Sequence, residues 1–355
     1  MNGAALSSSD RLRAIRQCRV SDASQGCVAP IYSGPGPHFW GLLVRVVSVM
    51  NYKGGVGKTT LTANVAAEIA NHGHRVLMID LDPQTNLTFS FYTVEEWNTD
   101  LRQTRTIQRW YEGDLPGRGI PLDELVLTPE RVNLVLKENA GQLDLISSHL
   151  GLIDIDLQLA AKLGGTTLAE SKRKFLSLHG CLAEALRSPA FRDYDIVLID
   201  CPPNFGLVTK TAIVASEFIL VPAKPDYLST LGIGYLRHSV DKLVEEFNAY
   251  LDHNGGGSSA QRISPQFAGV AFTMTQIHAG KPIGTQRTQI ENIREIGDMP
   301  VFATSVRNSP RYFAEAGPDG IPPILRMPLA DEVSRELRAL TDEFVAAIST
   351  GRHRS

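Results

Sequence analysis

A glycine-rich segment near residue 55 constrains this 355-residue chain more than any other feature. It places two lysines, Lys53 and Lys58, on either side of a turn. The apolar run Val44 to Met50 before it predicts a buried strand, and residues 60–71 after it predict a helix that ends at Gly73. Backbone N–H groups of such a strand-to-helix turn form a cradle for anionic oxygens. Two cations beside this cradle indicate a polyphosphate ligand.

The residues of this segment suit a nucleotide and its metal ion. Lys58 can contact the β- and γ-phosphates, and the Thr59 hydroxyl can complete the coordination of Mg²⁺. The general phosphate-loop pattern has a glycine where this chain has Tyr52. A glycine turn that merely happens to contain lysines is the alternative interpretation. The predicted phosphate-binding residues are Lys53, Gly54, Gly55, Val56, Gly57, Lys58, Thr59 and Thr60.

With a lysine directly after Tyr52, the segment resembles the deviant Walker A motif, KGGxGK[ST], of the ParA/MinD family of ATPases. The resemblance implies ATP and Mg²⁺ as cofactors and hydrolysis of ATP to ADP and phosphate. It also implies that Lys53 reaches across a nucleotide-sandwiched homodimer to the partner's phosphates. The likeness extends from about Val44 to about Ile348, and it is strong at three motifs and loose elsewhere.

A second motif follows the apolar run Arg75 to Asp80, which predicts a strand. The residues after it are similar to the family's DxDPQxN stretch, and alternation places Asp80 and Asp82 on the same side of an extended chain. The resemblance implies that Asp80 organises the hydration shell of Mg²⁺. It gives Asp82 a catalytic role beside Lys53 and Lys58, because Asp82 would orient or polarise the attacking water. A pair of solvated strand-end carboxylates is the alternative.

The third motif, residues 194–204, resembles a Walker B strand in which four apolar residues end in the carboxylate of Asp200. The resemblance implies that Asp200 holds Mg²⁺ through water. The Pro202-Pro203 pair after it is stiff enough to transmit a change at the γ-phosphate into the next loop. We expect Cys201 to be a small buried residue, because nothing in the sequence lowers its pKa.

Later segments continue the resemblance with less specificity. Asp226 occupies the place where relatives carry an acid that contacts the dimer partner or its nucleotide. Residues 267–274 are similar to the family's strand near the adenine, which makes Thr273 and Met274 candidates for the base pocket. Residues 301–307 are similar to a stretch before a short helix, where DNA-binding relatives carry basic residues that touch the phosphate backbone.

The candidate DNA contacts form a modest basic patch. Across residues 281–313, five basic residues stand against three acidic ones, so a solvated helix face with ordinary charge mixing is the alternative. The whole chain has a net charge of −3, and any contact with DNA must therefore come from a local patch. The candidates are Lys281, Arg287, Arg294, Arg307 and Arg311.

Composition narrows the class of protein further. The four cysteines show neither C-x-x-C spacing nor neighbouring histidines of zinc-site type, which indicates a reducing cytoplasm and argues against the iron-sulfur reductases that share this phosphate loop. No run reaches the roughly 18 uninterrupted apolar residues of a membrane span. The apolar face of the C-terminal segment, Leu329 to Ile348, is opposed by a polar face of mixed charge, so we expect core packing and no membrane partner.

Strands that alternate with helix-length segments predict an α/β fold with a mostly parallel twisted sheet and helices on both faces, and the resemblance implies that this fold is that of a P-loop NTPase. Residues 1–43 lack periodicity, and we expect a poorly ordered extension. A basic arm, a partner-binding extension or a misassigned start would each explain it, and we favour the last. Residues 44–350 are expected to form one ParA-like ATPase domain with an insertion around 88–141.

The insertion interleaves aromatic residues with arginines. Such a pattern is typical of a nucleic-acid face, but it also suits an amphipathic segment that packs its aromatics onto the core with arginines outside. We favour the second interpretation. The residues concerned are Trp97, Arg102, Arg105, Arg109, Trp110 and Tyr111.

The resemblance as a whole implies a ParA-like ATPase in the cytoplasm, associated with the nucleoid. It would form an ATP-sandwiched homodimer, bind DNA without sequence preference and drive the partition or positioning of a plasmid, chromosome or other cargo. A centromere-binding or adaptor protein that stimulates hydrolysis is the expected partner. The alternatives are a MinD-like spatial regulator at a membrane and a metabolic P-loop enzyme, such as a small-molecule kinase or synthetase.

Overall fold

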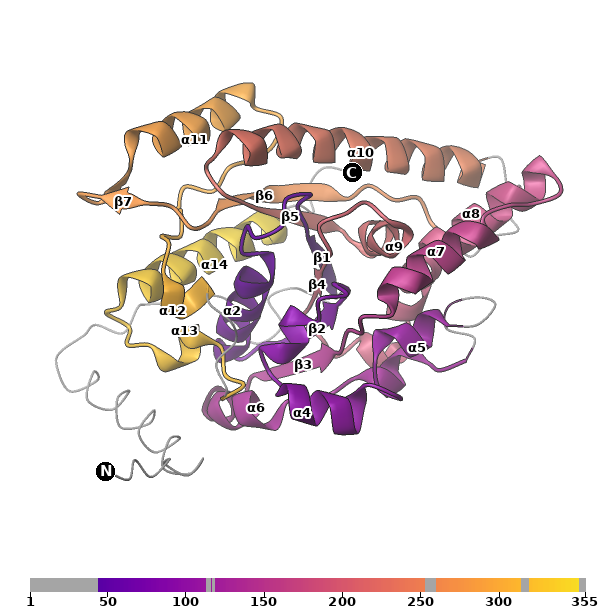
Figure 1. The fold of residues 1–355 in the computed structure, drawn as a ribbon, viewed down its shortest axis with the longest axis horizontal. Coiled ribbons are helices and arrows are strands. Elements are labelled where there is room, and N and C mark those ends of the chain that lie inside the picture. The colour runs from indigo at the N-terminus through magenta and orange to yellow at the C-terminus, as the bar shows by residue number, and fades with distance from the viewer. Residues whose placement is uncertain (1–43, 113–115, 117–118, 253–259, 314–318, 351–355) are drawn as a thin grey trace.

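A single parallel sheet forms the centre of the protein. The computed structural model describes residues 44–112, 116, 119–252, 260–313 and 319–350, so the expectation for residues 1–43 lies outside the described residues. Six strands pair in the order β3-β2-β4-β1-β5-β6, and every neighbouring pair is parallel (Figure 1). The strands are β1 (Arg45–Val49), β2 (Arg75–Asp80), β3 (Gln142–Ile146), β4 (Ile196–Asp200), β5 (Phe218–Ala223) and β6 (Gln266–Phe272).

Helices cover both faces of this sheet, which confirms the predicted fold class. One face is covered mainly by α2 (Lys58–Asn71), α6 (Glu130–Leu136), α13 (Pro323–Arg326) and α14 (Glu332–Thr350). The other face is covered by α5 (Ile107–Tyr111), α7 (Leu152–Lys162), α8 (Leu168–Leu186), α9 (Leu207–Ala215) and α10 (Tyr227–Asp252). Shorter elements complete the described fold: α3 (Asn86–Phe89), α4 (Val94–Glu96), the π-helical turn Trp97–Leu101, the 3-10 turns Leu122–Leu125, Lys137–Asn139 and Pro189–Phe191, the hairpin β7 (Ile277–His278) and β8 (Lys281–Pro282), α11 (Gly284–Ile296) and α12 (Pro310–Phe313).

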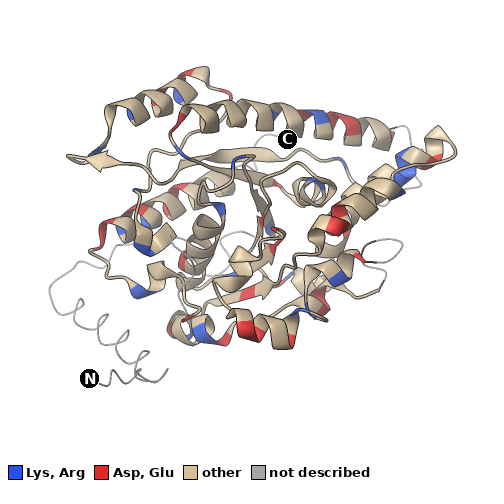
Figure 2. Cartoon of the chain, in the orientation of Figure 1, with Lys and Arg blue, Asp and Glu red and all other residues tan. Residues whose placement is uncertain are grey.

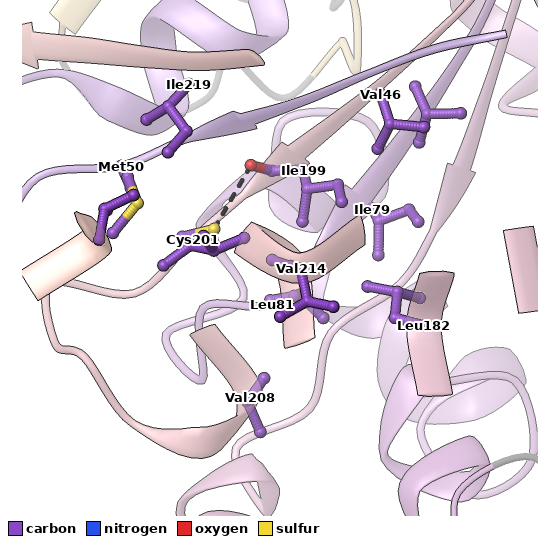
Figure 3. Packing of buried hydrophobic residues seen from close by; sticks show 14 of the residues in the cluster. Val46, Met50, Ile79, Leu81, Leu182, Ile199, Cys201, Val208, Val214 and Ile219 are labelled. Atoms are coloured by element: carbon purple, nitrogen blue, oxygen red, sulfur yellow. Dashed lines mark hydrogen bonds between the residues drawn. The ribbon is translucent and has the colours of Figure 1, made fainter. Parts of the chain in front are cut away.

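The strands are apolar because a parallel sheet is buried on both faces. Alternate residues of β4 therefore serve different cores, with Val197 and Ile199 facing α8 and α9, and Leu198 facing α2. Figure 3 shows the first of these cores, where Ile199 lies among apolar side chains of neighbouring strands and helices. Cys201 lies in the same cluster and is fully buried, as predicted. Burial raises the pKa of its thiol, so Cys201 is an unreactive core residue.

The insertion between β2 and β3 packs its aromatic residues inward. Trp97, Trp110 and Tyr111 are buried, and the Trp97 indole donates a hydrogen bond to the Ser148 carbonyl at 3.2 Å. Arginines 102, 105 and 109 are exposed. This arrangement confirms the amphipathic interpretation of the segment, in which the aromatic rings pack onto the core and the arginines face solvent.

The C-terminal helix α14 also packs as predicted. Its apolar face lies against α2 and β6. Three side chains of this face are at most 1% exposed: Leu337, Phe344 and Ile348. That face is occupied by the core of the protein and is not presented to a bilayer. Within the described residues, no helix combines the length and apolar character needed to cross a membrane.

Candidate functional site

The phosphate loop connects the end of β1 to the start of α2, as the sequence predicts. Gly55 and Gly57 have φ angles of +66° and +77°, a left-handed conformation that favours glycine. The turn therefore curls over the N-terminus of α2, which begins at Lys58 with no acidic residue in its first turn. Free N–H groups at this end of a 14-residue helix create a site for anionic oxygens.

The two lysines of the loop lie in different places. Lys58 is buried, with 6% of its surface exposed, and its ammonium lies 3.5 Å from the Lys53 carbonyl inside the loop. The Lys53 ammonium is directed outward and contacts both carboxylate oxygens of Asp226, at 2.7 and 2.8 Å. Partial burial acts to raise the pKa of Asp226, but the Lys53 ammonium and the Ser229 N–H outweigh it and the pKa is lowered. Lys58 is thus placed for a ligand in its own loop, and Lys53 is not.

Two of the predicted carboxylates meet at the carboxyl edge of the sheet. Asp80 and Asp200 are register partners on β2 and β4, and both are fully buried. Asp80 accepts hydrogen bonds from the backbone N–H and hydroxyl of Thr88, at 2.8 and 2.7 Å. Burial, reinforced by the nearby Asp200 charge, raises the pKa of Asp80 well above its ordinary value. Two carboxyl groups are thereby held close together in a water-poor environment that disfavours a negative charge on both.

The surroundings of Asp200 fit a magnesium ion. One carboxylate oxygen accepts the Thr59 hydroxyl at 2.7 Å, whereas the other is buried and has no hydrogen-bond partner among the described residues. Burial raises the pKa of Asp200 to about 7, against the opposing effects of the Thr59 hydroxyl and Lys58. A divalent cation would satisfy the orphaned oxygen and the buried charge. No cluster of three or more His, Cys, Asp or Glu suited to a metal occurs in the described ranges, as expected for Mg²⁺ held largely by phosphate and water.

Asp82 lies just beyond the sheet edge. It is 8% exposed, its carboxylate accepts the Gln84 N–H at 3.0 Å, and its own N–H donates to Asp80 at 3.2 Å. Ser148 fixes the same turn by donating to the Asp82 carbonyl at 2.7 Å. The carboxylate is therefore held in place at the wall of the cavity described next.

A cavity of about 840 Å³ opens over the phosphate loop. Its volume is within the range of nucleotide-sized ligand pockets. Among the predicted site residues, it is lined by Gly54, Gly55, Gly57, Lys58, Thr59, Thr60, Asp82, Met274 and the candidate DNA contact Arg311. Lys53, Asp226, Asp80 and Asp200 do not contribute to its lining. The sequence analysis missed other residues of the lining, which include Tyr92, Tyr312, Phe313, Pro322 and Pro323.

The two candidates for the base pocket lie in different places, and only one of them lines the cavity. Met274 lines the cavity, in a left-handed conformation with φ +52°. Thr273 is fully buried, and its hydroxyl donates to the Val56 carbonyl at 2.6 Å. Thr273 therefore supports the phosphate loop from beneath and does not face the cavity. Phe313 closes the loop from the other side, since a Cβ at Gly57 would come within 2.8 Å of its ring.

Tyr52, the residue that departs from the general loop pattern, connects the loop to two other elements. Its hydroxyl donates to Ser239 on α10 at 2.8 Å, and its ring centre lies 5.9 Å from that of Phe205. Phe205 follows the Pro202-Pro203 pair after β4. The expected switch segment is thus in direct contact with the phosphate loop.

The five basic residues proposed for DNA have different surroundings. The Arg307 guanidinium is paired with Glu332 and Glu336 of α14, and Arg294 donates to the Phe302 carbonyl at 3.0 Å. Arg287 lies 3.9 Å from Glu291, and Arg311 lines the cavity. Basic and acidic residues alternate along the helices (Figure 2). Lys281, on β8, is exposed, as are Arg287, Arg294 and Arg311, whereas Arg307 is half-buried.

Comparison with known protein families and sequences agrees with this site. A family model described as an AAA domain (AAA_31) matches residues 44–253, more than half of the chain. The chromosome partitioning protein ParA of Myxococcus xanthus is 31% identical over 222 residues, which cover 62% of this chain and 67% of that protein. The sporulation initiation inhibitor protein Soj of Bacillus subtilis is 28% identical over 284 residues, 80% of this chain and 92% of that protein. The cell division protein PomZ of M. xanthus is 32% identical, but only 54% of its length is matched.

Solved structures show the same fold. The ATP complex of a Cyanothece McdA variant has a TM-score of 0.61 at 18% identity, covering 90% of this chain and all of that chain. Cobyrinic acid a,c-diamide synthase from Mycobacterium smegmatis, with bound ADP and magnesium, has a TM-score of 0.59 at 20% identity, covering 87% and 97%. These identities support a common fold and no more. The sequence matches and the phosphate loop together show that the chain belongs to the ParA/MinD family of P-loop ATPases, in its ParA partition branch.

Proposed function

We propose that this protein is a partition ATPase that binds ATP and Mg²⁺ in the cavity over the phosphate loop and works as an ATP-sandwiched homodimer. The observation that carries the proposal is the separation of the two lysines. Lys58 lies inside its own loop, whereas the Lys53 ammonium is bound to Asp226 outside the cavity. The partial exposure of Lys53, at 33% of its side chain, supports the proposal, because a neighbouring molecule could reach it there.

The residues have distinct roles in this proposal. Lys58 and the backbone of the loop would bind the phosphates, and Thr59 with Asp200 would hold Mg²⁺, which supplies charge neutralisation when bound. Asp82 would orient the attacking water, because its carboxylate is fixed at the cavity wall. Lys53 would satisfy phosphate charge in the partner, much as an arginine finger does, an effect that can reach ~10³ to 10⁵ in rate.

Three substitutions test these roles in one assay series. Lys58→Ala should abolish binding of a fluorescent ATP analogue, and Lys53→Ala should preserve binding but lose the ATP-dependent dimer in sedimentation velocity. Asp82→Ala should accumulate an ATP-bound dimer that turns over slowly. Normal dimerisation and turnover by Lys53→Ala would show that the sandwich mechanism is wrong for this protein.

We further propose that the ATP dimer binds DNA without sequence preference and associates with the nucleoid, and that a centromere-binding or adaptor protein stimulates hydrolysis. Support comes from the partition proteins among its relatives and from the exposed Lys281 and Arg287. Phosphate contacts release counterions, so binding should weaken with salt at a log–log slope near −0.9 per contact. An electrophoretic shift of duplex DNA that requires ATP and decreases with salt is the expected result. Its absence would leave the ATPase proposal standing without the DNA component.

The burial of the α14 apolar face favours this proposal over a membrane-bound regulator. An interfacial helix needs an accessible apolar face opposite a basic one, and α14 has neither. Co-sedimentation with anionic liposomes in the presence of ATP would separate the two functions. We expect the protein to remain in the supernatant.

A further inference from the structure

The insertion between β2 and β3 is joined to the candidate site by a buried path of hydrogen bonds. Trp97, in the π-helical turn of the insertion, is 8% exposed and donates its indole N–H to the Ser148 carbonyl at 3.2 Å. Ser148 follows β3 and is fully buried. Its hydroxyl donates to the Asp82 carbonyl at 2.7 Å. The path therefore ends at the backbone of the residue to which we give the attacking water.

The turn that carries Asp82 depends on support from outside. Thr85 has φ +61°, a left-handed conformation that a β-branched residue rarely adopts. Such a conformation persists when the surrounding structure holds it. Inside the turn, Asp82 accepts the Thr85 N–H on its carbonyl at 2.9 Å and the Gln84 N–H on its carboxylate at 3.0 Å. Ser148 adds a hydrogen bond from 66 positions away, so a shift of Ser148 would shift Asp82.

Ser148 is itself fixed on two sides. Its carbonyl accepts from Trp97, and its N–H donates to the Thr88 hydroxyl at 3.0 Å. That hydroxyl in turn donates to Asp80 at 2.7 Å, and both Thr88 and Asp80 are fully buried. A buried network has few other arrangements, because each polar group left unpaired in the interior costs free energy. The direction of the Ser148 hydroxyl is therefore set by the residues around it.

Trp97 stands apart from the two cores that cover the sheet. It forms a small separate cluster with Leu101 and Leu127, against which Phe89 packs. The rings of Trp97 and Phe89 are edge to face with centres 5.7 Å apart, and Phe89 lines the nucleotide cavity. The cluster thus lies between the insertion and the site.

We propose that Trp97 and Ser148 are positioning residues for hydrolysis, through which the insertion holds Asp82 where it orients the attacking water. The inference rests on the proposed role of Asp82 and gives the insertion a use in that reaction. Small displacements of a group that orients a reactant are enough to slow a reaction. Binding of ATP is independent of this path, because Trp97 and Ser148 are not among the residues that line the cavity.

Ser148→Ala and Trp97→Phe each remove one hydrogen bond of the path. We expect the rate constant for single-turnover hydrolysis of ATP with Mg²⁺, counted per ATP-binding site, to fall ~3- to 10-fold in each variant. The dissociation constant of a fluorescent ATP analogue should not change. Counting by binding sites removes any unfolded fraction, and Trp97→Phe decides the matter if Ser148→Ala does not fold.

Trp110→Phe is the matched control, since it makes the same substitution in the same insertion. Trp110 is buried in the other core, where its ring centre lies 4.7 Å from that of Tyr111. Its rate constant should equal that of wild type. A loss as large as that of Trp97→Phe would overturn the inference, because the effect would then belong to the packing of the insertion in general.

Repeating both substitutions in an Asp82→Ala background tests whether they act through Asp82. Once the carboxylate is absent, each should change the remaining slow rate by less than ~2-fold, as expected for residues that act as one unit. A full further loss in that background would overturn the inference, and so would unchanged rates in the single variants or a parallel loss of ATP affinity. An Asp82→Ala protein that hydrolyses ATP at the wild-type rate would instead contradict the proposed function.

Discussion

The buried carboxylate of Asp200 should make the nucleotide-free protein less stable than it could be. Its pKa is raised by burial from 3.8 to about 7. A raised folded-state pKa means that the folded protein binds more protons than the unfolded chain between these pH values, so stability falls as pH rises through this window. A rise of this size in the pKa corresponds to ~4 kcal/mol at pH 8. Asp200→Asn removes that charge without changing the size of the side chain.

Part of the stability gained by removing the charge is lost again, because asparagine does not satisfy every hydrogen bond at this position. The asparagine oxygen can still accept the Thr59 hydroxyl, which Asp200 accepts at 2.7 Å. Its amide N–H₂ would point where the other Asp200 oxygen has no partner, and a buried unsatisfied donor costs ~1–3 kcal/mol. We therefore expect Asp200→Asn to stabilise the nucleotide-free protein by ~1–3 kcal/mol at pH 8. The advantage should shrink by ~2–3 kcal/mol between pH 8 and pH 5.

Urea unfolding in EDTA, without nucleotide, measures this effect at the two pH values. Wild-type protein should then gain stability when ATP and Mg²⁺ are added, because a ligand that binds only the folded state stabilises it. The variant should gain much less, because it lacks the carboxylate charge that would hold Mg²⁺. A variant that is less stable than wild type at pH 8 would refute the argument that this carboxylate is retained for a cation at the expense of stability.

Three further substitutions concern two buried side chains, Thr273 and His179, and the half-buried Glu343. Thr273→Val leaves the Val56 carbonyl without its 2.6 Å partner, so unfolding free energy should fall by ~1–3 kcal/mol in urea titration and ATP affinity should fall with it. Glu343→Gln weakens the carboxylate that accepts the Ala303 and Thr304 N–H groups at 2.7 and 2.8 Å, and we expect a loss of ~1–2 kcal/mol by the same measurement, with unchanged ATP affinity. Burial lowers the pKa of His179 from 6.5 to about 4, so the unfolded chain binds the proton more readily and stability falls as pH drops from 6.5 to 4. His179→Leu should flatten the dependence of unfolding free energy on pH in that window, and an unchanged slope would exclude His179 as its cause.

Local pattern was sufficient to predict the centre of this fold. The strand expected at Arg75 to Asp80 is β2 with the same bounds, and the phosphate loop lies between a strand and a helix as the glycines indicated. These features are set by residues close together in the chain, namely a run of apolar side chains and a turn that requires positive φ. The burial of the α14 face was predictable for the same reason, since its polar face lacks the basic character of a membrane-binding helix.

The remainder of the site depends on contacts between distant parts of the chain. The Lys53–Asp226 pair joins residues 173 positions apart, and the Thr273 bond to Val56 spans 217. Arg307 is a candidate DNA contact because of the motif that carries it, and its ion pairs with two glutamates of α14 follow from no local pattern. Arg311 is also a candidate DNA contact, and only the packing of α12 against the phosphate loop shows that it lines the cavity.

The most direct test of the sandwich mechanism is a crystal structure of the Asp82→Ala variant with ATP and Mg²⁺. We predict a two-fold dimer in which the Lys53 ammonium has left Asp226 of its own chain and lies within ion-pair distance of the triphosphate bound by the partner. A structure in which Lys53 still contacts its own Asp226, or contacts only the nucleotide of its own loop, would contradict the central claim.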